Sequence, residues 1–202
     1  MSGGRLIVVA SCLWLSVGCE RRPIELGFWI EPVSYRSPRI GDPITGAELA
    51  AIDRVAREEI ATAFENFDVT ISSNRQARFK VAVLAQLKDQ RLVRPGTYAG
   101  ESRAVAGFGG SGAVNFEYVA NGAMVFAPED ASRATVIEAL GRGLGRVAIH
   151  EFLHQLLPKK PLHDARDRHS YEGNSPAIVE GYFGDLHWDI AAPWLRERLK
   201  PR

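Results

Sequence analysis

The sequence His150-Glu151-Phe152-Leu153-His154 constrains this chain more than any other feature. Residues four apart lie on the same face of an α-helix, so a helix here brings both imidazoles to one side. Val147, Leu153 and Leu157 stand where they can pack inward beside the histidines. This segment is therefore expected to form a helix that packs against the protein and presents both histidines to one site.

Two imidazoles on one helical face can form part of a zinc site. Zn²⁺ binds histidine nitrogens at about 2.0–2.1 Å, and in hydrolases it takes three protein ligands and one water. The bound metal lowers the pKa of that water to about 7. Glu151, next to His150, can point at the same water and accept its proton. The sequence predicts Zn²⁺ held by His150 and His154, with Glu151 as the general base of a hydrolase.

The third ligand is expected to follow the helix. His163 is the preferred candidate, because two prolines after the motif end the helix and turn the chain, which can bring His163 back to the metal. Glu180 is the main competitor, since some zinc proteases combine the same helical motif with a downstream glutamate. His169 and Glu172 are weaker candidates in the intervening loop.

Residues 150–164 resemble the metzincin signature H-E-x-x-H-x-x-G-x-x-H-D. Leu157 stands at the glycine position, and three additional residues precede His163. Residues 175–182 resemble the region of the metzincin Met-turn, although no methionine stands there. The resemblance implies a zinc metallopeptidase that cleaves peptides or proteins. It also places Tyr182 near the metal, as a catalytic residue that donates a hydrogen bond to the oxyanion.

The hydrophobic pattern predicts helices and strands around the motif. Thr45 and Glu48 form a capping box that begins a helix over 46–65. Apolar alternation predicts the strands, and Asn121-Gly122 predicts a hairpin between the last two. The expected strands are 26–31, 67–72, 77–86, 113–120 and 123–127, with a loop over 88–112.

Two further helices are expected in the second half of the chain. The motif helix should begin after Ser132 and end near Leu157, where Pro158 follows. Gly141, Gly143 and Gly145 weaken it and mark where it can divide. A last helix is expected to begin near 175 or after 184 and to continue toward 199. This order predicts an α+β fold, metzincin-like, with a mixed twisted sheet, a long N-terminal helix, an active-site helix and a C-terminal helix.

The N-terminal segment resembles an export signal. Arg5 precedes the apolar residues 6–17, which are too few to span a bilayer. Small residues before Cys19 resemble the lipobox of bacterial lipoproteins, in which the cysteine carries lipid. Cys12 leaves with the signal, so the mature chain has no internal disulfide. We expect an exported, membrane-anchored lipoprotein facing the periplasm or exterior, with ordinary secretion as the alternative.

The predicted organisation is a signal peptide over 1–18, a tether and first strand over 19–44, and a zinc metallopeptidase-like domain over 45–202. The net charge of +1 and the scattered basic residues do not favour nucleic acid as a partner. A peptide substrate is expected to add to an edge strand near 113–120. A non-catalytic metal-binding lipoprotein with a peptidase-like fold remains the alternative, as does a cell-wall amidase. The presence of Glu151 favours an enzyme, because a structural metal site does not need it.

Overall fold

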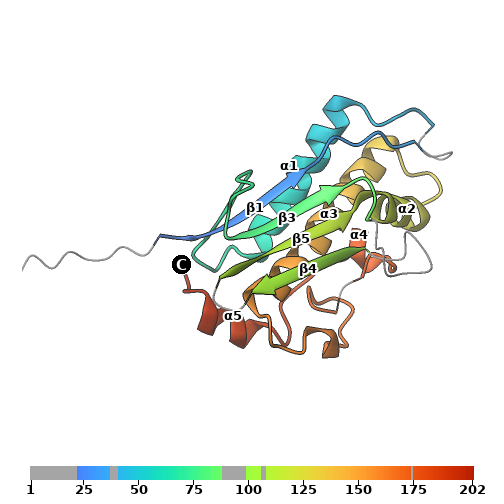
Figure 1. The fold of residues 1–202 in the computed structure, drawn as a ribbon. Helices are drawn as coiled ribbons and strands as arrows, with labels where there is room; N and C mark the ends of the chain where they lie inside the picture. Colours follow the sequence, from blue (N-terminus) through green and yellow to red (C-terminus); the bar gives the residue numbers. More distant parts are fainter. Residues whose placement is uncertain (1–21, 37–40, 88–98, 106–107, 174) are drawn as a thin grey trace, which may run out of the picture.

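The computed structural model describes residues 22–36, 41–87, 99–105, 108–173 and 175–202. Five strands form one mixed sheet in the order β2-β1-β3-β5-β4 (Figure 1). Strands β1, β2, β3 and β5 are parallel, whereas β4 is antiparallel to β5 and forms one edge. The strands are β1 (Ile24–Ile30), β2 (Val69–Ser72), β3 (Phe79–Leu84), β4 (Gly100–Val105) and β5 (Gly109–Asn115). The prediction of a mixed sheet combined with helices is confirmed.

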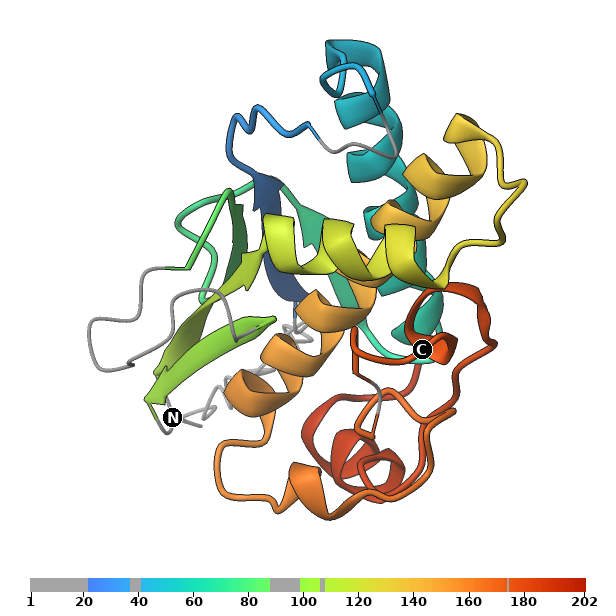
Figure 2. The ribbon, with the colours of Figure 1, turned by 90° about the vertical axis from the view of Figure 1, so that its right-hand side faces the viewer.

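The two longest helices cover one face of this sheet (Figure 2). Phe79, Val81 and Val83 alternate along β3 and are buried in the core that these helices complete. The helices are α1 (Gly46–Ala63), α2 (Phe116–Phe126), α3 (Arg133–Leu156), α4 (Glu180–Phe183) and α5 (Ala192–Arg198), with a 3-10 turn, η1, at Leu162–Asp164. Among the described residues, no helix combines the length and apolar character needed to cross a membrane.

The capping box at the start of α1 is confirmed. The Thr45 hydroxyl accepts a hydrogen bond from the Glu48 amide at 3.2 Å, and the Glu48 carboxylate accepts one from the Thr45 amide at 2.8 Å. The same carboxylate accepts a hydrogen bond from Arg133 at 2.9 Å. Because Arg133 is the first residue of α3, this contact also joins the starts of the two long helices.

The predicted hairpin over 113–127 is wrong, because residues 116–126 form α2. The Asn115 side chain caps this helix by accepting a hydrogen bond from the Tyr118 amide at 3.2 Å. The apolar residues of α2 recur at helical spacing and face the core, which outweighs the turn preference of Asn-Gly. Gly122 serves packing instead, since a Cβ there would lie 2.0 Å from the Tyr182 hydroxyl oxygen.

The predicted loop over 88–112 is also wrong in part. Strand β4 and the first residues of β5 lie within it, while residues 88–98 and 106–107 lie outside the described structure. Strand β5 begins Gly-Gly-Ser-Gly, so it has few of the apolar and β-branched residues by which strands are recognised. The sheet is therefore more extensive than the hydrophobic pattern indicates.

Helix α3 is continuous despite its three glycines. A Cβ at Gly141 would lie 2.7 Å from the Cβ of Val55, and one at Gly145 would lie 2.7 Å from the Ala56 carbonyl oxygen. These glycines therefore allow α1 and α3 to approach closely, and that packing compensates for their low helix propensity. The last helix, expected to begin near 175 or after 184, is present as α5 over 192–198, and residues 180–183 form the separate short helix α4.

The expected tether and first strand, residues 19–44, are described only over 22–36 and 41–44. Strand β1 comes from this range and pairs with both β2 and β3. The predicted signal peptide and Cys19 lie outside the described residues.

Candidate metal centre and cleft

Three histidines converge beside the C-terminal part of α3. His150 and His154 lie on this helix and His163 lies in η1. The Nε2 atoms of His150 and His154 are 3.1 Å apart, and candidate ligand atoms of all three residues lie within 4.8 Å of one another. Two nitrogens bound to a tetrahedral zinc at about 2.0–2.1 Å are separated by roughly 3.3 Å. The helical pair is therefore already close to the spacing of zinc ligands.

The segment after α3 carries His163 back toward the helix. The helix ends at Leu156, and Pro158 follows its C-cap residue. The Lys160 amide donates to the Leu157 carbonyl oxygen at 3.0 Å, which closes a turn directly after the helix. Leu162 is 1 % exposed and packs into the core, whereas the adjacent His163 remains exposed. The buried leucine thus fixes a short segment that presents His163 on the open side of the cluster.

The competing third ligands lie elsewhere. The Glu180 carboxylate forms an ion pair with Arg168 at 3.0 Å. The Glu172 carboxylate is buried and accepts hydrogen bonds from the backbone amides of Asp189, at 3.1 Å, and Ala191, at 2.5 Å. Neither glutamate belongs to the histidine cluster found among the described residues, and His169 does not belong to it either. The geometry brings together His150, His154 and His163.

The catalytic role expected of Tyr182 is wrong in this structure. Its side chain is fully buried, and its hydroxyl lies 2.8 Å from the Pro176 carbonyl oxygen and 3.0 Å from that of Val119. Its ring stacks on Phe126 with centroids 5.8 Å apart. Burial raises the pKa of the phenol further. Because its proton is directed at backbone carbonyls within the core, Tyr182 supports packing and does not line the cleft.

Glu151 is buried beside the histidines, with 4 % of its surface exposed. Its Oε2 atom has no hydrogen-bond partner among the described residues. Burial, followed by the nearby charge of Glu101, raises the pKa of Glu151 to about 8. Gly100 of β4 makes room for this carboxyl group, since a Cβ there would lie 2.4 Å from Oε1. A buried carboxyl group without a partner is costly, so its retention here indicates a role other than stability.

His150 is held in its neutral form. Burial, followed by the charges of His154 and His163, lowers the pKa of His150 to about 3. The backbone at Tyr171 and Glu172 partly opposes this shift, although Nδ1 has no partner of normal hydrogen-bond geometry in the part of the chain that the structure describes. Neutral imidazole is the form that can bind a metal, so burial favours the form of His150 in which it could act as a ligand.

The three histidines and Glu151 open into a cleft of about 650 Å³. Strand β4 forms one wall through Gly100, Glu101, Ser102 and Ala104. The other walls come from α3 and from segments near residues 163–165, 172–173 and 175–176. The prediction that residues 113–120 form the edge beside the site is wrong, because β5 is paired on both sides and β4 is the edge strand. The cleft is therefore bordered by an extended strand whose outer side is unpaired within the described sheet.

Gln155 fixes the position of α3 against the sheet and was not singled out from the sequence. Its Nε2 donates to the Lys80 carbonyl oxygen at 3.1 Å, and its Oε1 accepts from the Lys80 amide at 3.0 Å. A Cβ at Gly110 would lie 2.4 Å from the Gln155 Cγ, so this glycine admits the side chain. Two sequence features could have indicated this contact: the glycines of β5, and Gln155 itself directly after His154.

Comparison of the chain with protein family models, with curated proteins and with solved structures found no match.

Proposed function

We propose that this chain is a zinc-dependent hydrolase, and that its substrates are peptides or proteins. One observation carries the proposal: three histidine side chains converge beside a buried carboxyl group whose Oε2 atom has no hydrogen-bond partner among the described residues. All four side chains line the same cleft. The signature of residues 150–164, which resembles that of the metzincins, supports the same conclusion from the sequence.

The donor set suits zinc. Three imidazole nitrogens favour zinc over magnesium or calcium, which prefer oxygen ligands. Catalytic zinc sites combine three protein ligands with an open fourth position, and the exposure of His163 leaves this side of the cluster accessible. Zinc bound there would lower the pKa of a water molecule to about 7 and polarise a substrate carbonyl.

In the proposed reaction, Glu151 would transfer the proton of the attacking water. Because it follows His150 on α3 and lines the same cleft, its carboxylate can accept a proton from the attacking water. It then passes this proton to the amine that leaves. Gly100 leaves space for the carboxyl group and Gln155 fixes the helix that carries it, so both would act by positioning Glu151.

Strand β4 supplies a means of holding an extended substrate. A peptide can pair with the outer side of an edge strand through main-chain hydrogen bonds. Ser102 is tied inward, with its hydroxyl 3.1 Å from the Glu151 carbonyl oxygen, so β4 lies directly along the catalytic part of α3. A peptide bound along residues 100–105 would therefore pass the histidine cluster.

The central experiment compares Glu151→Gln with the wild type. Glutamine keeps the shape of the side chain but accepts no proton, so we expect zinc content near one per chain and peptide hydrolysis reduced by about 10²–10⁴-fold. Glu138→Gln is the matched control, since Glu138 lies on the same helix with its side chain 56 % exposed. The assays are metal analysis and cleavage of a diverse peptide library. Undiminished hydrolysis by Glu151→Gln would remove this residue from the mechanism.

A non-catalytic metal-binding role is the second candidate function. The same experiment distinguishes it from a hydrolase. It predicts zinc binding by the wild type without hydrolysis of any peptide. The buried carboxyl group of Glu151, whose Oε2 atom has no partner within the described structure, argues against it, because a purely structural zinc site gains nothing from that group. Hydrolysis of cell-wall amides in place of peptides would keep the zinc chemistry and change the substrate class to that of an amidase.

We also propose that the protein is exported and anchored through lipid on Cys19, facing the periplasm or exterior. The lipobox-like sequence before Cys19 supports this location. In a bacterial host, Cys19→Ser should abolish incorporation of labelled fatty acid and move the protein out of the membrane fraction. Wild-type protein that is fully soluble and carries a free thiol at Cys19 would refute the anchor.

A further inference from the structure

Several termini of the secondary-structure elements meet at one end of the sheet, which we call the β1-start end. Parallel pairing places Ile24 beside Val69, and Phe79 beside Gly110, so β1, β2, β3 and β5 all begin there. Because β4 is antiparallel, it finishes at this end, where Val105 pairs with Gly109. Helix α5 and the C-terminus lie at the same end (Figure 1).

A groove of about 400 Å³ lies at this end, between the end of α3, the facing residues Val105 of β4 and Gly109 of β5, and α5. Val105 lines this groove and is 61 % exposed. Phe108, whose amide donates to the Val105 carbonyl oxygen at 2.9 Å, is 81 % exposed. Trp194 of α5 also lines the groove, and the Lys160 Nζ lies 4.8 Å from the centre of its ring. We define the docking patch as the following residues that line or adjoin this groove: Val105, Phe108, Lys159, Lys160, Trp194 and Arg198.

The docking patch is positively charged. Three exposed cations line its groove together with one carboxylate, that of Glu197. Exposed Lys200 and Arg202 follow α5, and the backbone of the last residues is hydrogen-bonded to the segment that leads into β2. Cations around protruding aromatic and aliphatic side chains are the pattern of surfaces that bind at the interface of an anionic bilayer.

The path of the chain indicates which surface this end faces. Exposed Arg22 lies two residues before the start of β1, and Cys19 lies only three residues earlier in the sequence. Three residues span at most about 11 Å. Lipid on Cys19 would therefore keep the β1-start end, and the docking patch with it, close to the membrane.

We propose that the docking patch binds the surface of an anionic phospholipid bilayer, with Phe108 and Val105 inserted between headgroups and the cations paired with lipid phosphates. The choice of a bilayer as the occupant rests on the proposed anchor at Cys19. Binding by the patch itself requires neither the acyl chain nor zinc, so the two proposals can fail separately. A single acyl chain gives only marginal membrane affinity, and a basic patch is the kind of second contact that makes anchoring stable.

The test uses residues 20–202, which carry no acyl group and include every helix and strand of the structure. Binding is measured by co-sedimentation with vesicles of phosphatidylcholine alone or with phosphatidylglycerol added. We expect binding only to the anionic vesicles and a decrease as salt is raised. Lys159→Gln/Lys160→Gln should lower the partition coefficient roughly 25-fold, at about fivefold for each cation removed. Phe108→Ser should lower it without changing the salt dependence.

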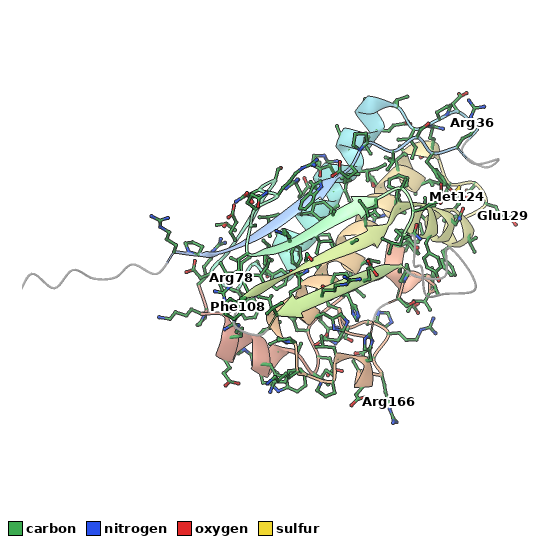
Figure 3. All side chains as sticks on the ribbon, in the orientation of Figure 1. Arg36, Arg78, Phe108, Met124, Glu129 and Arg166 are labelled. Carbon is green, nitrogen blue, oxygen red and sulfur yellow. The ribbon has the colours of Figure 1, made fainter. Side chains whose placement is uncertain are left out.

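The control removes the same charge far from the patch. Arg36 and Arg166 are exposed and lie well away from Phe108 in Figure 3, so Arg36→Gln/Arg166→Gln should bind vesicles like the wild type. Equal losses in the two double variants would show attraction by net charge alone and overturn the proposal. Absence of binding to anionic vesicles by the unmutated domain would also overturn it. A third outcome is that Lys159→Gln/Lys160→Gln binds vesicles like the wild type but cleaves acidic peptides more weakly. That result would overturn the proposal and assign the two lysines to a substrate subsite.

Discussion

Gly122→Ala tests why a glycine stands in the middle of α2. An alanine in an exposed helix interior is normally more stable than a glycine, by about 1 kcal/mol. At this position, however, the new Cβ would lie 2.0 Å from the Tyr182 hydroxyl oxygen, 2.6 Å from the Pro176 carbonyl oxygen and 2.7 Å from the Tyr182 Cζ. Tyr182 is fully buried, so its ring cannot move aside into solvent. The substitution therefore sets helix propensity against packing.

Packing should win. Overpacking a core typically costs about 1–3 kcal/mol, and displacing the buried hydroxyl from its carbonyl partners adds about 1–3 kcal/mol. After the gain in helix propensity of about 1 kcal/mol is subtracted, we expect Gly122→Ala to lower the free energy of unfolding by about 1–5 kcal/mol. The expected sign is thus opposite to that of an ordinary helical glycine.

The assay is urea denaturation followed by tryptophan fluorescence, with the slope of the transition compared between variants. Tyr182→Phe removes the oxygen at 2.0 Å but leaves the ring carbon at 2.7 Å. Gly122→Ala should therefore cost less in the Tyr182→Phe background, and the difference gives the coupling between the two side chains. A stabilised Gly122→Ala variant, or strictly additive effects in the double mutant, would refute the packing argument.

Two further predictions concern the site. In Gly100→Ala the new Cβ displaces the Glu151 carboxyl group, so hydrolysis should fall about 10²-fold with zinc retained. Gly46→Ala is the control and should leave activity unchanged, because no described atom lies within 4 Å of the new Cβ. Kinetics and metal analysis on both variants test this, and equal activities would contradict it. His163→Ala should lower zinc affinity by at least about tenfold while Glu180→Ala changes it little, as measured by competition with a chelating dye. The reverse result would assign the third ligand to Glu180.

The parts of the fold that depend on local chemistry could be predicted from the sequence. The capping box of α1 is one such case, because Thr45 and Glu48 bond to each other's backbone without help from distant residues. The motif helix is another, since apolar spacing and Pro158 mark its course and end. Helix propensity and capping act within a few residues, so one segment of sequence is enough to reveal them.

The parts that depend on distant contacts could not be predicted. Gly110 and Gly100 suggested a loop when considered along the chain, yet in the sheet they admit the side chains of Gln155 and Glu151. Gly122 suggested a turn, yet it admits Tyr182, which is 60 residues away in the chain. In each case the glycine is required by a side chain from another element, and no local pattern records that requirement.

The third histidine shows how a local signal and a tertiary contact combine. The prolines after the motif limited where the chain could go, but they did not determine that it returns to the helix face bearing His150 and His154. That return depends on Leu162, whose burial in the core fixes the segment on which His163 stands. In the metzincin signature the corresponding turn is shorter and contains a glycine. Here three more residues and a buried leucine bring a histidine to the same pair, so the lengthened turn is compatible with a complete set of three nitrogen ligands.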